Sequence, residues 1–424
     1  MDAAQPRDEP SPVAGAARLP VGLLLFLLSL HVLNQVDRQL VAAFAADIMR
    51  DLDLSRSQFG LIAGLAFSGV YAVAALAAGI MADRLGRAKV LSAGLGIWSL
   101  FTALAGLAQG FWTMLGARPF VAAGEATLVP TASNIILDRV GDRHKAGALG
   151  LFFAGIPLGI GGGFLIAGQL GPVLGWRGTF VLMGALGIVA LAALTRLRDD
   201  PPDLSHRPSL IGNLAALFAV LRTKPRALWA SLAIIVAHAH TATSPFVQLW
   251  LTAEKGYDPK GAAQLYGGMF VVVGLIGTFG AGLLGDWAKR RFGIDRAVTM
   301  FVLLLALAPL LGLYRLAPGG SAGFLAGMTG SILFMTVIYG PIFAIIEELL
   351  PARLKATSTG FNMLALNIVA IGGGALAIGV ASQWLAAAGS SRSWTLPLMG
   401  ADAFALLSVV FIFLAMRSPR VLAD

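Results

Sequence analysis

Four ionisable residues lie inside long apolar stretches of this 424-residue chain: Asp37, Arg38, Arg118 and Glu125. A charged side chain without a partner at the centre of a bilayer costs roughly 2.5–3.5 kcal/mol. Four such costs approach the stability of a whole domain, so these residues, called here the charged quartet, must face one another or a wet cavity. Arginines bind anions and buried carboxyls exchange protons, so the quartet predicts an anion clamp beside proton-carrying acids.

The spacing of the quartet is consistent with a shared site. Glu125 follows Arg118 by seven residues, which places both on one helix face with Glu125 about 10 Å further along the axis. Asp37 and Arg38 lie at a comparable depth in their own apolar stretch. The alternative, in which ion pairs within the quartet only hold two helices together, stays open on this evidence.

The composition defines the class of protein. Hydrophobic residues make up 57% of the chain and charged residues only 12%, whereas soluble domains carry about 25% charged residues. Too few charges are present to cover a water-soluble surface, so the chain is predicted to be an integral membrane protein. The net charge of +9 is scattered in short clusters between apolar runs, which argues against nucleic-acid binding, and the absence of Cys excludes disulfides and thiolate chemistry.

About 20 apolar residues span a bilayer, and twelve stretches of the chain meet that requirement. An all-α membrane protein of twelve transmembrane helices is therefore predicted. The predicted spans are 20–45, 57–81, 88–108, 112–136, 146–170, 178–196, 227–251, 262–284, 297–316, 322–347, 356–384 and 396–416.

The distribution of basic residues predicts the orientation. With both termini cytoplasmic, 22 of the 31 Lys and Arg residues fall on the cytoplasmic side, two lie in spans, and seven fall in outer loops. Those seven are Arg50, Arg56, Arg177, Lys255, Lys260, Arg315 and Arg392. Short loops and the lack of any Asn-x-Ser/Thr acceptor are compatible with a bacterial inner membrane.

Internal repetition divides the chain into two halves of six spans. Gly79-x-x-x-Asp83 reappears as Gly282-x-x-x-Asp286 at an offset of 203 residues. Pro130 matches Pro341, and the triplet 161–163 matches the triplet 372–374, both at an offset of 211. Parallel halves of this kind are an arrangement found in transporters.

The expected organisation follows from the spans and the repeat. It is a disordered tail 1–18, an N-terminal half 19–196, a cytoplasmic linker 197–226 with an interfacial amphipathic helix, a C-terminal half 227–416 and a short tail 417–424.

Two sets of motifs resemble a known family. The loop from Gly79 to Lys89, GIMADRLGRAK, resembles the signature loop of the major facilitator superfamily. Asn34-x-x-Asp37-Arg38 and the run from Arg118 through Gly124-Glu125-Ala126 resemble its Spinster branch. The chain departs from that branch at Gln35, where Tyr is usual, and at Ala122, where Gly is usual.

The resemblance implies a conformational latch on the cytoplasmic side. Its residues, the latch residues, are Gly79, Asp83, Arg84, Gly86, Arg87 and Asp138, with Asp286 and Glu347 as counterparts in the second half. Asp83 is expected to face the N-terminus of the helix of span 356–384, and Arg87 to pair with Asp138. Lys289, Arg290 and Glu348 complete the second-half set. The alternative is that these are ordinary charges at headgroup level.

The resemblance also implies a function. We expect a secondary active transporter that works by alternating access, is coupled to protons and moves an amphipathic anion of the lysolipid or sphingoid-phosphate type. Arg38, Arg118 and Asn34 are the expected substrate-binding residues, and Asp37 and Glu125 the expected proton-coupling acids. No cofactor is expected, and the protein is expected to be a monomer that contacts membrane lipids.

Three other functions compete with this one. A proton-coupled carrier of small organic anions or drugs is the main alternative. A polytopic enzyme that modifies lipids is more distant, because no catalytic motif is found. A channel is disfavoured by the duplicated halves.

His238 and His240 lie two residues apart, on nearly opposite helix faces, and cannot chelate one metal ion together.

Overall fold

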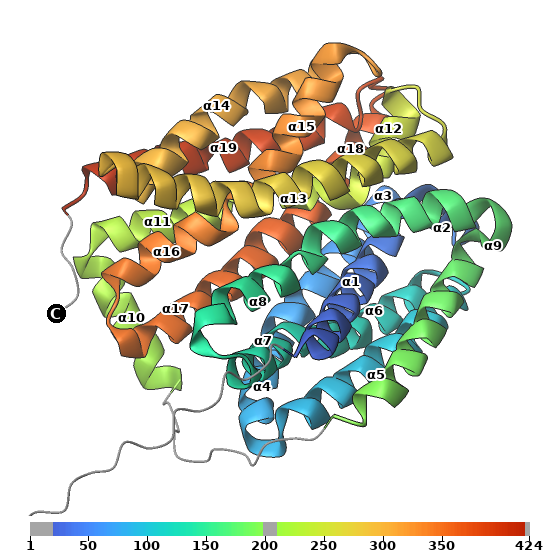
Figure 1. Ribbon diagram of the computed structural model, residues 1–424. Helices are drawn as coiled ribbons and strands as arrows, with labels where there is room; N and C mark the ends of the chain where they lie inside the picture. The colour runs from blue at the N-terminus through green and yellow to red at the C-terminus, as the bar shows by residue number, and fades with distance from the viewer. Residues whose placement is uncertain (1–19, 198–209, 420–424) are drawn as a thin grey trace, which may run out of the picture.

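The computed structural model describes residues 20–197 and 210–419, in which every regular element is a helix (Figure 1). The elements of the first half are α1 Val21–Ala43, α2 Ala45–Asp51, α3 Arg56–Gly60, η1 Leu61–Leu65, α4 Ala66–Leu85, α5 Arg87–Gly106, α6 Phe111–Glu125, α7 Leu128–Arg139, η2 Asp142–His144, α8 Lys145–Phe153 and α9 Gly155–Leu194. The elements after the gap are α10 Leu210–Thr223, α11 Pro225–Ala237, η3 Thr241–Phe246, α12 Val247–Glu254, α13 Pro259–Phe292, α14 Arg296–Leu316, α15 Ala322–Val337, α16 Tyr339–Leu349, α17 Ala352–Ala365, η4 Leu366–Gly373, α18 Gly374–Ala387 and α19 Thr395–Arg417.

These helices confirm the predicted fold class. Within the described residues, ten helical segments are long and apolar enough to cross a membrane. One of them, Asp142–Leu194, covers two predicted spans, which are separated by a kink at Gly175, a residue with a φ of 63°. The predicted span 322–347 corresponds to α15 and α16, which are separated by a bend at Ile338. Twelve crossings result.

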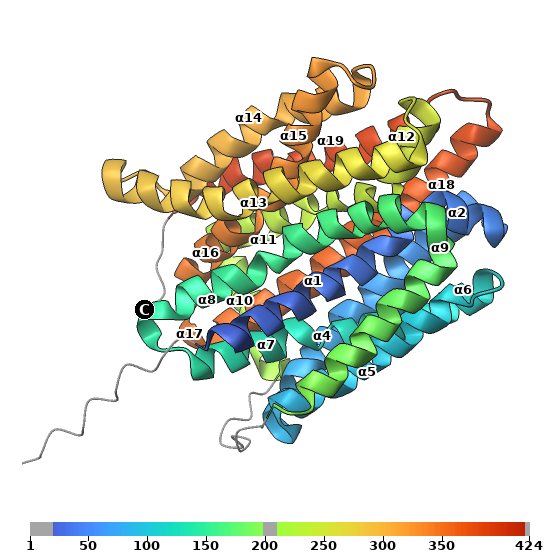
Figure 2. The ribbon, with the colours of Figure 1, turned by 45° about the vertical axis from the view of Figure 1, so that its right-hand side comes forward.

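The bundle has two ends, which we name for the chain ends (Figure 2). The terminal face is the end at which α1 begins and α19 ends, and the distal face is the opposite end, with the α5–α6 and α18–α19 connections. The predicted N-terminal tail, residues 198–209 of the predicted linker and residues 420–424 of the predicted C-terminal tail lie outside the described residues. Within the predicted linker, α10 packs against α17, where the Phe218 and Phe361 rings lie 5.2 Å apart.

Proline residues interrupt two helices at mid-depth. The fourth crossing breaks between α6 and α7, directly after Glu125, because Pro130 has no N–H to donate to the carbonyl of Ala126. The seventh crossing breaks between α11 and α12, where residues 238–246 form turns and a short 3₁₀ helix that contains Pro245. Both breaks put backbone and polar side chains in the interior of the bundle.

Glycine residues allow the two halves to approach closely. A Cβ atom added at Gly161 on α9 would lie 2.5 Å from the carbonyl oxygen of Gly267 on α13. A Cβ atom at Gly60 would lie 2.8 Å from the carbonyl oxygen of Ala375 on α18. Within the glycine triplet 161–163, Gly161 therefore allows close packing against the other half, whereas Gly163 packs against α1 of its own half.

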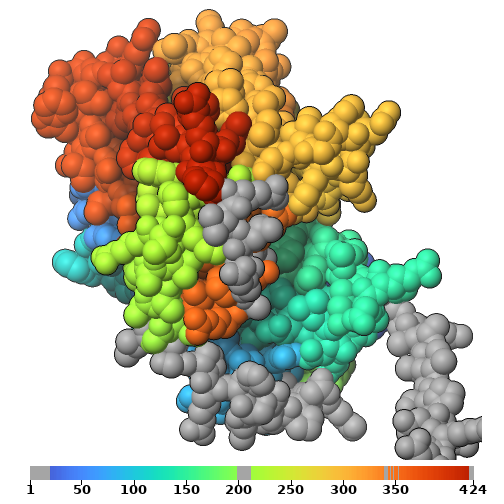
Figure 3. Space-filling model, turned by 90° about the vertical axis from the view of Figure 1, so that its left-hand side faces the viewer, coloured from blue at the N-terminus to red at the C-terminus, as the bar shows by residue number. Residues whose placement is uncertain are grey.

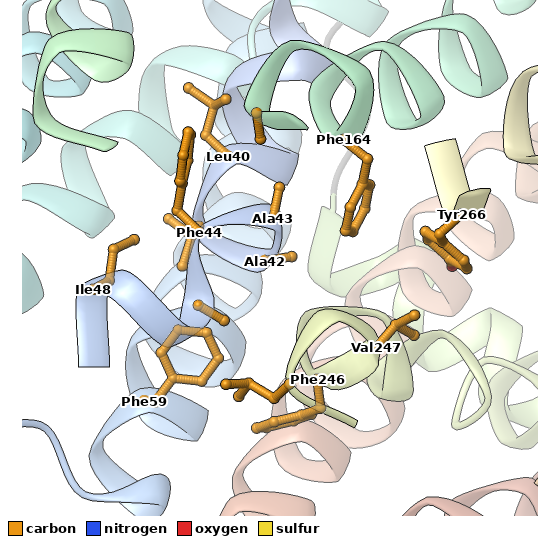
Figure 4. Close-up of a cluster of buried hydrophobic side chains, with 14 of the residues drawn as sticks. Leu40, Ala42, Ala43, Phe44, Ile48, Phe59, Phe164, Phe246, Val247 and Tyr266 are labelled. Atoms are coloured by element: carbon orange, nitrogen blue, oxygen red, sulfur yellow. The ribbon is translucent and has the colours of Figure 1, made fainter. Parts of the chain in front are cut away.

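A buried apolar cluster closes the distal side of the bundle. Figure 4 shows this cluster, which we call the distal plug: Leu40, Ala42, Ala43, Phe44, Ile48, Phe59, Phe164, Phe246, Val247 and Tyr266. The rings of Phe59 and Phe246, from different halves, lie 5.8 Å apart, and those of Phe164 and Tyr266 lie 4.8 Å apart. Apolar contact across the halves stabilises this closed arrangement.

We expect Gly161→Ala to weaken this closed arrangement. Its methyl group meets backbone that cannot move freely, and overpacking typically costs about 1–3 kcal/mol. Gly162→Ala is the matched control, because its Cβ atom meets only Val36 Cγ2, at an ordinary 3.6 Å. Spin labels on Cys residues at Arg50 and Ser391, both exposed near the distal face, measure the separation of the halves. Equal distance distributions in the two variants would contradict the expectation.

Candidate functional site

Helix α1 carries the first part of the site. Asp37 is buried, and the Thr102 hydroxyl on α5 donates to its Oδ2 at 3.5 Å. The amide of Asn34, one turn earlier, donates to the backbone carbonyl of Glu125 at 3.4 Å. Asn34 therefore links α1 to the fourth crossing at the point where α6 ends.

Helix α6 carries the second part of the site. Arg118 and Glu125 are both buried, at 3% and 0% exposure. Within the described part of the chain, neither carboxylate oxygen of Glu125 has a hydrogen-bond partner. Burial without hydrogen-bond donors is costly for a charged carboxylate, so the surroundings of Glu125 stabilise its charged form poorly.

Aromatic rings on α4 bring the two arginines together. The Cζ atom of Arg118 lies 4.5 Å from the centre of the Phe67 ring, and that of Arg38 lies 4.8 Å from the same ring. Arg38 also lies 5.0 Å from the ring of Tyr71. Both guanidinium groups act electrostatically on Glu125. The structure therefore places both arginines of the quartet over one aromatic ring.

The quartet is not held together by direct ion pairs. Among the described residues, no N–O distance of 4.0 Å or less joins any two of its members. Arg38 is only half-buried, whereas the other three are buried. Close charges without direct ion pairs do not fit a cluster whose members only hold two helices together.

Sequence reasoning missed Phe67, Tyr71 and Thr102 as neighbours of the quartet. Phe67 and Tyr71 are four residues apart, so they share a helix face, and that spacing was the available signal.

Sequence reasoning also missed a buried ion pair in the second half. Arg315 was predicted to lie in an outer loop, which is wrong: it belongs to α14 and is 1% exposed. Its Nε donates to Asp402 Oδ2 on α19 at 2.7 Å, and its Nη2 donates to Asp402 Oδ1 at 3.4 Å. The signal for Asp402 was its place as a lone acid within the last apolar stretch.

The first-half latch residues are only partly assembled in this conformation. Arg87 forms an ion pair with Asp138, the pairing that the family resemblance implies. Asp83 and Arg84 are exposed, and in the described part of the chain Asp83 has no hydrogen bond or ion pair. A Cβ atom at Gly79 would meet nothing within 4 Å, so the close helix contact expected there is absent in this conformation. Gly86, with a φ of 100°, forms the tight turn from α4 to α5.

The second-half latch residues centre on a basic residue that was not expected. Arg296 donates to Asp286 at 2.9 Å and to Glu348 at 2.5 Å, and Lys289 donates to Glu348 at 3.1 Å. Arg290 is exposed, and the side chain of Glu347 lies outside what the structure describes. Each of these ion pairs between described residues joins two residues of the same half.

The hydrogen bonds that join described residues of the two halves lie at the distal face. In the described residues there are three: Arg56 Nη1 donates to the Ser382 carbonyl and to Ser393 Oγ, and the Ser57 N–H donates to Gln383 Oε1. Figure 3 looks onto the terminal face, where the surface recedes between the orange segments of the second half and the teal segments of the first. The conformation is therefore closed at the distal face.

This fold and site define a class of protein, a transporter with two helical halves around a central charged site. Residues 27–374 match the model of the Major Facilitator Superfamily, and the chain belongs to that family. It is a transporter rather than an enzyme, related to Spinster and to other carriers of organic substrates.

Individual relatives agree with this membership. The chain is 29% identical to an MFS-type efflux pump of Mycolicibacterium smegmatis, over 83% of this chain and 82% of that protein. It is 23% identical to protein spinster of Drosophila melanogaster, over 88% of this chain and 64% of that protein. Its fold is similar, with a TM-score of 0.81 and 24% identity over 95% of this chain and 98% of the other, to a bacterial homolog of the human lysosomal transporter Spinster, solved in an inward-facing and unoccupied conformation.

Proposed function

We propose that this protein is a proton-coupled transporter of an amphipathic anion of the lysolipid or sphingoid-phosphate type. The observation that carries the proposal is the pair of guanidinium groups, on Arg38 and Arg118, over the single ring of Phe67. Two planar cations side by side suit a phosphate or carboxylate headgroup. The aromatic surface beside them suits the apolar chain that follows the headgroup.

The proposed binding order follows from exposure. Arg38 is half-buried and Arg118 is buried, so an entering anion reaches Arg38 first. Asn34 is hydrogen-bonded to the backbone carbonyl of Glu125, so movement of the headgroup toward Asn34 is transmitted to the fourth crossing.

Glu125 and Asp37 are the proposed coupling acids. Glu125 is fully buried with two unpartnered oxygens, and Asp37 keeps Oδ1 unpartnered among the described residues. A substrate anion competes with Glu125 for the same two guanidinium groups, which favours protonation of the carboxyl when substrate binds. Proton uptake and anion binding are linked in this way.

The latch residues and the orientation complete the proposal. We propose that the terminal face is cytoplasmic and that the membrane is a bacterial inner membrane, which the distribution of Lys and Arg favours. Asp83, exposed in this conformation, would contact the N-terminus of α17 when the cytoplasmic side closes. The protein is proposed to act as a monomer with six-helix halves 19–196 and 227–416 joined by the linker 197–226.

Glu125→Gln tests the coupling. We expect this variant to bind a lysophosphatidate but to lose its accumulation in liposomes under an imposed pH gradient, because the amide mimics the protonated acid permanently. Asp258→Asn is the control, because it makes the same change of a carboxylate to an amide. Asp258 caps α13 by accepting a hydrogen bond from the Gly261 N–H, and Asn caps a helix equally well. Full proton-driven accumulation by Glu125→Gln would show that the coupling assignment is wrong.

A carrier of small organic anions or drugs is the second candidate, favoured by the similarity to an efflux pump. The same liposomes distinguish the two: uptake of a small carboxylate, with no response to lysophosphatidate, would favour this second function.

A further inference from the structure

A second group of buried ionisable side chains lies in the C-terminal half, apart from the charged quartet. His240 Nδ1 is 2.7 Å from Asp402 Oδ1, and Asp402 in turn accepts from Arg315. On the other side of the imidazole ring, Nε2 lies 3.0 Å from Ser331 Oγ and 3.2 Å from the Ser331 carbonyl oxygen. We call these four residues the His240 cluster.

The hydrogen bonds around His240 suit both protonation states of the ring. Asp402 only accepts, so Nδ1 carries a proton in either state. The neutral ring accepts at Nε2 from the Ser331 hydroxyl, and the protonated ring donates from Nε2 to the Ser331 carbonyl. A proton taken from water forms the new N–H bond, the hydroxyl rotates away, and deprotonation returns that proton to water.

The charges around the ring make its protonation state matter for packing. The ionisable groups that face the cluster are Asp402 on α19, Arg315 and Tyr314 on α14 and Tyr266 on α13. Lys255, which follows α12, is bonded to the Arg315 carbonyl. α15 contributes the uncharged Ser331 and Phe334. Arg315 and Asp402 balance each other, so a proton on His240 adds an uncompensated charge to a closed, buried site.

The internal repeat places His240 at the position of Asp37. The two residues are 203 apart, the same offset that relates Asp83 to Asp286. Each half therefore carries a buried ionisable residue at the same point of its first membrane crossing.

His240 also lies in a hinge. The N–H groups of His240, Thr241 and Thr243 bond three residues back, so the helix winds as 3₁₀ just before Pro245. A 3₁₀ stretch within a longer helix is typical of a point of bending. This segment reaches the contact between the halves, because the ring of Phe246 packs against the ring of Phe59 from the first half in the distal plug. Within its own half, Ala242 packs against Gly374 at the start of α18.

We propose that His240 is a second proton-binding site of this transporter, and that its protonation favours opening of the distal face. Water reaches the ring when the hinge moves, and the added charge is stabilised in that open conformation. The proposal goes beyond the coupling function proposed above and holds whether or not Glu125 carries the coupling proton.

The test uses the full chain in lipid nanodiscs with Glu125→Gln as background, so that failure of the Glu125 proposal leaves it intact. Spin labels at Arg50→Cys and Ser391→Cys report the distal separation as the pH falls from about 8 to about 5, the range in which a histidine changes its charge. We expect the open population to rise at least about threefold, and His240→Gln to abolish that rise. His238→Gln is the matched control, since His238 is equally buried but faces the Ile234 carbonyl of its own helix.

Histidine ¹⁵N spectra give a second readout without any conformational label. The signal that His240→Gln removes should change from a neutral ring to an imidazolium over the same pH range. Ser331→Ala, which removes the donor used only by the neutral ring, should move this transition to higher pH. A ring that stays neutral throughout, or a distal response that survives His240→Gln, would overturn the proposal; should His240→Gln fail to fold, the Ser331→Ala shift decides.

Discussion

Arg118→Gln should weaken binding of an anionic lysolipid by roughly 10- to 100-fold, because a charge-assisted hydrogen bond contributes about 1.5–3 kcal/mol. Arg118 is buried, and its Nε atom has no partner among the described residues. Its guanidinium group lies over the Phe67 ring, as does that of Arg38, so the two cations face the same part of the site. Titration of the purified protein with lysophosphatidate, followed by tryptophan fluorescence, measures the change in Kd.

An uncharged ligand supplies the control for this prediction. A monoacylglycerol of the same chain length lacks the charge that Arg118 is proposed to bind, so its affinity should be nearly unchanged. Arg118→Lys keeps the charge but loses the planar guanidinium group. We therefore expect its affinity for the anionic lysolipid to lie between that of the unchanged protein and that of Arg118→Gln. Equal losses for charged and uncharged ligands, together with a lower melting temperature, would instead indicate a structural role.

Arg315→Met should destabilise the protein by about 3–5 kcal/mol, the typical cost of leaving one member of a buried ion pair alone. Arg315 and Asp402 have side-chain exposures of 0% and 6%, so water cannot replace the lost partner. The measurement is reversible unfolding in detergent as a function of denaturant.

A double substitution distinguishes the cost of an unpaired buried charge from a general loss of stability. Arg315→Met with Asp402→Asn removes both charges, and it should recover most of the lost stability, since the Asn still accepts from His240. Arg50→Met is the control, because the exposed pair of Arg50 with Asp47 contributes less than about 1 kcal/mol. A double variant as unstable as the single one would contradict the argument.

Apolar length predicted the helices well, because hydrophobic stretches of about 20 residues have few alternatives in a membrane. The same reasoning failed for Arg315, which lies at the very end of its apolar stretch. The spacing of residues in the sequence gives the depth of a side chain along its helix, but it does not identify the residue on another helix that this side chain contacts. The pairing with Asp402, 87 residues later, depends on how α14 and α19 pack against each other.

The charged quartet could be predicted because charges in apolar stretches are rare and costly. Phe67 and Tyr71 could not, because aromatic residues are equally suited to lipid, to helix packing and to a binding site. The latch residues present a different difficulty. The role proposed for Asp83 belongs to a conformation closed at the terminal face, whereas this structure is closed at the distal face and leaves Asp83 exposed.

The two faces differ in how strongly dissolved salt acts on them. At the distal face, the halves are joined by apolar packing and by hydrogen bonds to uncharged acceptors, as for Arg56 with Ser382 and Ser393. At the terminal face the exposed groups are charged, including Asp83, Arg84 and Arg290, and ions screen them over about 8 Å at physiological ionic strength. Rising ionic strength therefore weakens contacts between charged groups that would close the terminal face, and it leaves the distal contacts nearly unchanged. The balance between the conformation closed at the terminal face and the conformation closed at the distal face then depends on the salt around the membrane.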